Sequence, residues 1–110
     1  MSATLDAEVL DMLVEVIGAD AARGVIDLFL GECQELTAVM VAPGADAQAI
    51  GRAAHSLKSS AGQLGAVGLS EAALAVETAA SIASPELPQL VTALGRCATE
   101  TRAALAGRIR

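Results

Sequence analysis

Hydrophobic residues recur at helical spacing in the middle of the chain. One set lies between residues 50 and 64 and consists of Ile50, Ala53, Ala54, Leu57, Ala61 and Leu64. Steps of three and four residues place such side chains on one face of a helix, which then packs against a core. His55 lies about 140° around the helix from the centre of this face. We therefore expect a helix with His55 on its outer side.

The residues expected around His55 on this helix are small. Gly51 precedes it by four residues, and Ser59 and Gly62 follow it by four and seven. Lys58 follows by three, and residues at this spacing are neighbours, with Cβ atoms about 5–6 Å apart. The only histidine and the only lysine of the chain should therefore form one local unit. Another protein can approach this imidazole, because nothing bulky stands beside it.

The same spacing predicts two helices before this one. The first begins with Thr4 as N-cap and ends near Gly18, because threonine favours the N-cap and glycine the C-terminal end of a helix. The second begins with Asp20 as N-cap and runs to about Val41. Pro43 and the glycine after it should end this helix.

Two further helices are expected after the helix of His55. Asp46 should cap the helix of His55, which should end in a turn around Gly65 and Gly68. A fourth, alanine-rich helix follows. The sequence Ser84-Pro85-Glu86 predicts the start of the last helix, with serine as N-cap and proline at the first helical position. Arginines near the end of this last helix complement its dipole, namely Arg102, Arg108 and Arg110.

Chain length and composition favour one all-α domain. The hydrophobic fraction is 54%, and it contains a single aromatic residue, Phe29. Such a composition suits closely packed helices, whereas a β-rich fold would use more aromatic residues. Short connections make successive helices antiparallel. We predict that residues 1–110 form one domain, an antiparallel up-down four-helix bundle with a short accessory N-terminal helix.

Charge and hydropathy narrow the classes of partner. The formal net charge is −6, which argues against binding to nucleic acid and gives no reason to expect binding to an anionic membrane. No apolar run reaches the length of about 18 residues that a transmembrane helix needs. The N-terminus also lacks the basic start and apolar block of a signal peptide. We therefore expect a cytoplasmic protein.

The two cysteines, Cys33 and Cys97, occupy positions on the apolar faces of their helices. Two distant cysteines without a secretion signal are most simply reduced core residues. The alternatives are redox chemistry or metal binding, for which their spacing gives no support.

The stretch Ala54–Leu69 reads AHSLKSSAGQLGAVGL. It resembles the signature of histidine phosphotransfer (HPt) domains, in which His-x-Leu-Lys is followed by small residues and then Leu-Gly-Ala. The matching positions are His55, Leu57, Lys58, Ala61, Leu64, Gly65 and Ala66. The resemblance implies a helical bundle in which His55 is phosphorylated and Lys58 assists the phosphoryl group. Ser59 stands where the family often has glycine. Glu77 aligns with a glutamine found near the phosphohistidine in some members, and its role here stays open.

The chemistry of the residues agrees with that role. An exposed histidine is mostly neutral at pH 7, and a nearby lysine disfavours its protonated form. Neutral imidazole can take a phosphoryl group from an aspartyl-phosphate, while Lys58 offsets the charge in transfer. Ser59 can donate a hydrogen bond or can simply be small. The residues expected to dock a partner are Gly51, Arg52, Ser59, Gly62 and Gln63.

The two glycines among them have alternative explanations. Glycine inside a helix costs about 0.5–1 kcal/mol relative to alanine. Close docking of a partner at Gly51 and Gly62 would account for this cost. They can also be helix-packing contacts or tolerated defects.

We therefore predict a phosphocarrier of a multistep phosphorelay. The chain has no nucleotide-binding loop, and one histidine cannot form a metal site with spaced partners, so we expect neither enzyme activity nor a cofactor. Mg²⁺ should be bound by the partner receiver domain. The expected partners are response-regulator receiver domains and a hybrid histidine kinase, with this protein as a monomer.

The alternative is a non-catalytic module that binds and inhibits a kinase or receiver. The chain is too short for a dimerising protein with a degenerate ATPase domain.

Overall fold

The computed structural model describes residues 4–108, which contain five α-helices and no strand. The helices are α1 (Ala7–Ile17), α2 (Ala19–Val41), α3 (Ala47–Gln63), α4 (Val67–Ser81) and α5 (Leu87–Arg108). The predicted all-α class is confirmed. Arg110, expected among the arginines of the last helix, lies outside the described residues.

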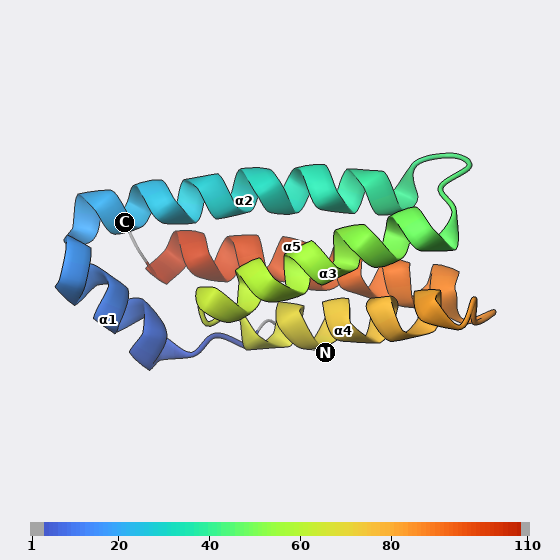
Figure 1. Ribbon diagram of the computed structural model, residues 1–110. Coiled ribbons are helices and arrows are strands. Elements are labelled where there is room, and N and C mark those ends of the chain that lie inside the picture. Colours follow the sequence, from blue (N-terminus) through green and yellow to red (C-terminus); the bar gives the residue numbers. More distant parts are fainter. Residues whose placement is uncertain (1–3, 109–110) are drawn as a thin grey trace.

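The four longer helices extend along the long axis of the molecule, and successive ones run in opposite directions (Figure 1). Helix α3 packs against both α4 and α2, and α5 packs against α4 and α2. Helix α1 packs against α2 and lies at an angle to it at one end of the molecule. Within residues 4–108 no helix combines the length and the apolar character needed to cross a lipid bilayer.

Aliphatic side chains from all five helices form the core. Its largest fully buried members include Leu57 of α3, Leu69 and Val76 of α4, and Leu94 and Leu105 of α5. Fully burying a side chain of this size contributes about 1.5–3 kcal/mol. The whole apolar face predicted around His55 is at most 8% exposed, so the predicted helical phase of α3 is confirmed.

Both cysteines belong to this core. Cys33 and Cys97 are 4% and 2% exposed, and neither forms a disulfide. Burial raises the pKa of both thiols, because a thiolate loses hydration inside the fold. The predicted placement of both cysteines in the core is confirmed.

The predicted caps of the first two helices are wrong, whereas that of α3 is confirmed. The side chain of Asp46 accepts a hydrogen bond from the amide of Ala49 at 2.7 Å. Helix α1 is capped by Asp6 in place of Thr4, because the carbonyl of Thr4 accepts a bond from the start of α4 and the chain turns helical only afterwards. Helix α2 begins directly after Gly18, whose φ of 89° ends α1 and leaves no linker. Asp20 therefore lies inside the first turn.

The turn between α3 and α4 uses only one of its two predicted glycines. Gly65 has a φ of 75°, a conformation that favours glycine. A Cβ atom there would also lie 3.0 Å from the carbonyl oxygen of Asp6 and from Cβ of Val9. Gly68 is instead buried in the first turn of α4, where its amide donates to the carbonyl of Thr4 at 3.2 Å. The N-terminal segment is thus bonded to the end of the helix that carries His55.

The last helix begins later than its cap predicts. The hydroxyl of Ser84 accepts a hydrogen bond from the amide of Glu86 at 3.2 Å, as expected of a capping serine. The regular helix nevertheless starts at Leu87. Pro88 has no N–H with which to bond the carbonyl of Ser84, and the regular bonds begin with the amide of Leu90, which donates to the carbonyl of Glu86 at 3.1 Å.

Candidate functional site

His55 projects from the middle of α3 on the side away from the core. Its side chain is 62% exposed, whereas its neighbours Ala54 and Leu57 are fully buried. The spacing of apolar residues in α3 dictates this orientation, because burying Ala53, Ala54 and Leu57 turns residue 55 outward. The imidazole is therefore open to another molecule.

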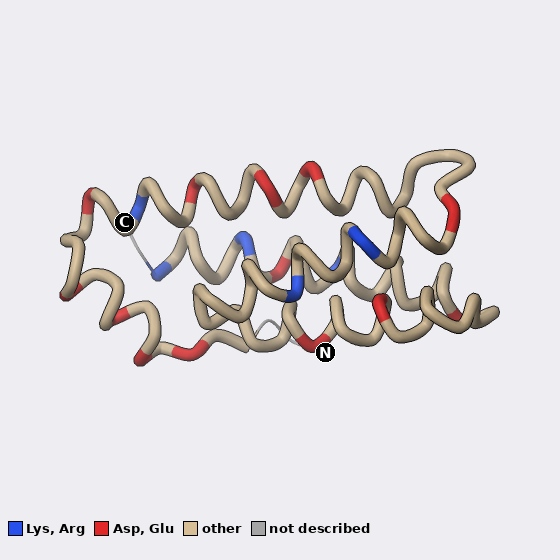
Figure 2. Tube along the Cα trace, in the orientation of Figure 1, with Lys and Arg blue, Asp and Glu red and all other residues tan. Residues whose placement is uncertain are grey.

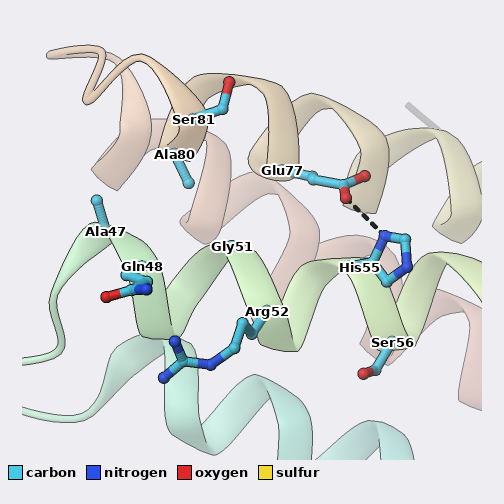
Figure 3. A pocket seen from close by; sticks show the side chains of 9 residues that line it. All are labelled: Ala47, Gln48, Gly51, Arg52, His55, Ser56, Glu77, Ala80 and Ser81. Carbon is cyan, nitrogen blue, oxygen red and sulfur yellow. Dashed lines mark hydrogen bonds and ion pairs between the residues drawn. The ribbon is translucent and has the colours of Figure 1, made fainter.

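Glu77 of α4 contacts both His55 and Lys58. Its Oε2 atom lies 2.6 Å from Nδ1 of His55 (Figure 3), and its Oε1 atom accepts a hydrogen bond from Nζ of Lys58 at 2.7 Å. The hydrogen bond from Lys58, followed by that from His55, lowers the pKa of the Glu77 carboxyl. A single ionised carboxylate thus joins the histidine and the lysine.

This contact determines which nitrogen of the ring is free. An ionised carboxylate only accepts hydrogen bonds, so Nδ1 of His55 must carry a proton to bond with it. In the neutral ring the lone pair then lies on Nε2. Among the described residues no hydrogen-bond partner contacts Nε2. In the neutral ring, the arrangement leaves Nε2 without a proton and, among the described residues, without a partner on an exposed helix face.

Lys58 is turned toward α4. Its side chain is 30% exposed, and its ammonium is bonded to Glu77. Its backbone carbonyl also accepts a hydrogen bond from the hydroxyl of Ser70 at 3.0 Å. Lys58 is therefore a neighbour of His55 as its spacing predicts, and the two are connected through Glu77.

The contribution of Glu77 could not be read from the local pattern. It lies 22 residues after His55, and helix periodicity relates only positions on the same helix. The pairing of α3 with α4 in this register creates the contact. The signal available in the sequence was its alignment with a glutamine position of HPt domains, which left its role open.

A groove between α3 and α4 extends from His55 toward the start of α3. Figure 3 shows its lining residues, which are Ala47, Gln48, Gly51, Arg52, His55, Ser56, Glu77, Ala80 and Ser81. The side chain of Arg52 extends away from Glu77 in this view. Of the residues predicted to dock a partner, the groove includes Gly51 and Arg52.

The other predicted docking residues lie elsewhere on α3. Ser59, Gly62 and Gln63 are exposed and outside the groove. Gln63 lines a second hollow with Leu28 of α2, a side chain that is 78% exposed. Ser59 makes no side-chain hydrogen bond within residues 4–108.

The two glycines near His55 differ in their surroundings. A Cβ atom on Gly51 would lie 3.3 Å from Cβ of Ala80, which is a tight contact with α4. A Cβ atom on Gly62 would lie 3.6 Å from the hydroxyl of Ser70, an ordinary distance. The helix-packing explanation therefore fits Gly51, and Gly62 has room for a methyl group.

The charges are unevenly distributed over the molecule (Figure 2). The blue positions on α3 are Arg52 and Lys58, whereas α1 and most of α2 carry acidic residues. Within the described residues Arg52 has no ion-pair partner. A cationic side chain thus remains available beside the histidine on a protein of net charge −6.

Comparisons with known proteins agree with this site. Residues 24–106 match the Hpt domain family. The structure is also similar to the crystal structure of histidine-containing phosphotransfer protein B (HptB) from Pseudomonas aeruginosa PAO1, with a TM-score of 0.88 and 28% sequence identity, covering 96% of this chain and 93% of that chain. No curated protein sequence matches the chain. The family match covers all of α3, α4 and the His55 motif, and we conclude that this chain belongs to the Hpt domain family, the histidine phosphotransfer proteins of two-component signalling.

Proposed function

We propose that the protein is a phosphocarrier of a multistep phosphorelay, in which His55 accepts a phosphoryl group from a receiver-domain aspartate and passes it to another receiver. Hpt domains are phosphocarrier modules that interact with receiver domains and histidine kinases. The observation that carries the proposal is the exposed ring of His55, whose Nδ1 atom is occupied by Glu77 while Nε2 is free.

The geometry supports in-line transfer to Nε2. A phosphoryl group passes between two atoms that approach it from opposite sides, and the exposure of His55 leaves room for this approach. Lys58 uses one donor on Glu77, and an ammonium has three. A remaining donor can bond an oxygen of the phosphoryl group and offset its charge. Ser59 can supply a further hydrogen bond from the same helix.

We assign partner docking to the surface formed by Gly51, Arg52, Ser59, Gly62 and Gln63. The partner site must contain the acceptor or donor aspartate and, in our proposal, a bound Mg²⁺ that this chain does not supply. An acidic site suits a surface in which Arg52 is unpaired, since opposite charges favour encounter. The proposed partners are receiver domains and a hybrid histidine kinase in the cytoplasm.

The scaffold we propose for this function is one domain, residues 1–110, acting as a monomer. We interpret α2 to α5 as an antiparallel up-down four-helix bundle and α1 as an accessory helix. The opposite directions of successive helices in Figure 1 support this interpretation. Such a bundle holds α3 rigidly by its buried face and leaves its outer face to the partner.

Transfer from a phosphorylated receiver tests the proposal. A purified receiver domain is labelled on its aspartate and mixed with wild-type protein, His55→Ala and the control Ser56→Ala, which removes an exposed hydroxyl one residue away. We expect acid-labile, base-stable label on the wild type and on Ser56→Ala, and none on His55→Ala. Label that persists on His55→Ala would overturn the assignment of His55.

A further inference from the structure

The second hollow lies where α1, α2 and the last turns of α3 meet, outside the groove described above. Its lining includes Leu13 of α1, Val25 and Leu28 of α2, and Ser60 and Gln63 of α3. Leu28 is 78% exposed and Val25 is 36% exposed. A single apolar residue on a surface needs no explanation, whereas apolar residues grouped around a hollow commonly mark a site of interaction. The structure therefore leaves an apolar surface uncovered at this end of α3.

The charges around this hollow are almost all negative. Eight acidic residues and one arginine lie between residues 6 and 35, which span α1 and most of α2. Arg23 and Arg108 each pair with one of these carboxylates at 2.8 Å. Glu32 contributes a carboxylate to the lining itself, and Figure 2 shows the other red positions along α1 and α2. The opposite charge occurs on α3, at Arg52 and Lys58.

Building on the proposed function, we infer that the second hollow determines which receivers this protein accepts, by binding a receiver helix whose apolar residues are flanked by lysine or arginine. The apolar lining takes the aliphatic side chains of that helix, and the surrounding carboxylates attract its cationic groups. The hollow therefore selects the partner, whereas the residues around His55 carry out the transfer.

A helix of the receiver is the occupant that the shape and the location of the hollow favour. Hollows between packed helices suit the apolar face of an amphipathic helix. Gln63 lines this hollow and follows His55 by eight residues, a distance of about 12 Å along α3. A stable protein interface covers about 800 Å² on each partner, a patch about 30 Å across. A receiver whose aspartate reaches His55 therefore also covers the hollow.

The charge pattern allows the receiver one orientation. Near His55 the receiver must bring the acidic site that holds its aspartate, which suits the cationic Arg52. At the second hollow it meets carboxylates, including that of Glu32. Opposite charges accelerate encounter, and like charges brought together cost affinity. A receiver with a cationic helix next to its acidic site matches both ends of this surface, whereas a receiver with an acidic helix is rejected.

Shortening Leu28 tests whether the hollow binds the receiver. Transfer from a phosphorylated receiver that labels the wild type is measured at rising concentrations of this protein, which gives a half-saturation concentration and a saturating rate. We expect Leu28→Ala to raise the half-saturation concentration by about tenfold, because truncating a central apolar contact weakens binding, and to leave the saturating rate unchanged. Val39→Ala is the control, since Val39 is on the same helix, 43% exposed and outside the hollow.

Reversing a charge tests the selectivity. Glu32→Lys removes an attraction and adds a repulsion, so we expect a half-saturation concentration about fivefold higher with a receiver that carries a basic helix. Sodium chloride should reduce this difference, because salt screens surface charges. A receiver with an acidic helix should instead bind Glu32→Lys better than the wild type. Glu100→Lys makes the same charge change at an exposed position of α5, which packs on α4 and α2, so it controls for net charge.

The outcomes separate this inference from the proposed function. Wild-type half-saturation concentrations in both Leu28→Ala and Glu32→Lys would overturn the inference, as would equal effects of the two control substitutions. In either case the proposed function stands, provided that the wild type is labelled and His55→Ala is not. If no receiver labels the wild type, the proposed function fails, and this inference fails with it.

Discussion

The chemistry at the residue scale depends on how three side chains share two hydrogen bonds. Glu77 holds Nδ1 of His55 at 2.6 Å and Nζ of Lys58 at 2.7 Å. This arrangement selects the ring nitrogen that is free, because the proton must lie between Nδ1 and the carboxylate. It also places the ammonium of Lys58 on the same carboxylate. Lys58 is therefore connected to His55 through Glu77.

Lys58→Ala should slow phosphotransfer without unfolding the protein. We expect the transfer rate to fall by roughly tenfold, since a cationic hydrogen-bond donor near the phosphoryl group is lost in a partly solvated site. The side chain is 30% exposed, so its removal leaves no large cavity. The kinetics of transfer from a phosphorylated receiver measure the rate, and thermal unfolding measures the stability. The same measurements are made on Arg52→Ala, which also removes a positive charge from α3. A large loss of thermal stability in Lys58→Ala would contradict its placement.

The carboxyl of Glu77 also makes the stability of the protein depend on pH. Its pKa is lower in the folded protein than in the unfolded chain, chiefly because of Lys58. A lowered pKa stabilises the fold above the unfolded value and loses this effect as the pH falls through the folded value. Urea unfolding should therefore show a wild-type advantage over Glu77→Gln at pH 7 that shrinks at pH values below the usual glutamate range. An advantage that stays constant into acid would contradict the lowered pKa.

Local spacing predicts only part of this site. The i, i+3 relation places His55 next to Lys58, and the apolar face of the helix places His55 outside the core. The contact with Glu77 depends on how α3 and α4 pack, and no pattern within one helix specifies that register. Consequently, the contact of Glu77 with His55 and Lys58 became visible only in the structure.

At the scale of the secondary-structure element, the buried face of α3 fixes the direction of His55. Leu57 is fully buried, and truncating a buried leucine costs about 2–5 kcal/mol. We expect Leu57→Ala to lower the free energy of unfolding by this amount in urea denaturation. Ser59→Ala, an exposed change on the same helix, should have little effect. A change within experimental error for Leu57→Ala would mean that the helical phase, and with it the orientation of His55, is wrong.

Gly62 offers a test of docking that is independent of the chemistry. A methyl group there has ordinary space beside Ser70, and alanine favours a helix over glycine by about 0.5–1 kcal/mol. Gly62→Ala should therefore stabilise the protein while slowing transfer, because the methyl group projects into the proposed docking surface. Gly95→Ala is the matched control, since a Cβ atom there contacts nothing within 4 Å and α5 packs on α4 and α2. Equal transfer rates in both variants would remove Gly62 from the docking surface.

The element boundaries show which local signals suffice. Asp46 caps α3 as predicted because the chain approaches it through an ordinary loop. Thr4 fails as a cap because its carbonyl is engaged by the start of α4, a contact that the local sequence does not specify. Asp20 fails because Gly18 joins two helices directly. Caps were therefore predictable where neither a tertiary contact nor a directly preceding helix displaced them.

At the scale of the whole molecule, the residues that stabilise the fold and the residues of the candidate site lie in different places. Apolar side chains from five helices form the core, and the exposed ring of His55 stands on the outer face of α3. Periodicity and composition predicted the all-α class, because both are properties of single helices. The pairing of α3 with α4 that completes the site required the folded chain.

The same fold could also serve a protein that only binds and inhibits a kinase or receiver. The two functions differ in whether they need the side chain of His55. An interaction module would retain full biological activity in His55→Ala, because the surface around the residue remains. A phosphocarrier would lose it, because no other described residue presents an exposed imidazole. Complementation of a deletion strain with this variant separates them.

Mapping the transferred phosphoryl group tests the central claim most directly. Arg52 and Lys58 flank the site, so trypsin should release the short peptide Ala53–Lys58, which contains His55 and Ser56. After transfer from a phosphorylated receiver, we predict one phosphoryl group on this peptide, lost in acid and retained in base. Phosphate on another peptide, or acid-stable phosphate on Ser56, would contradict the account.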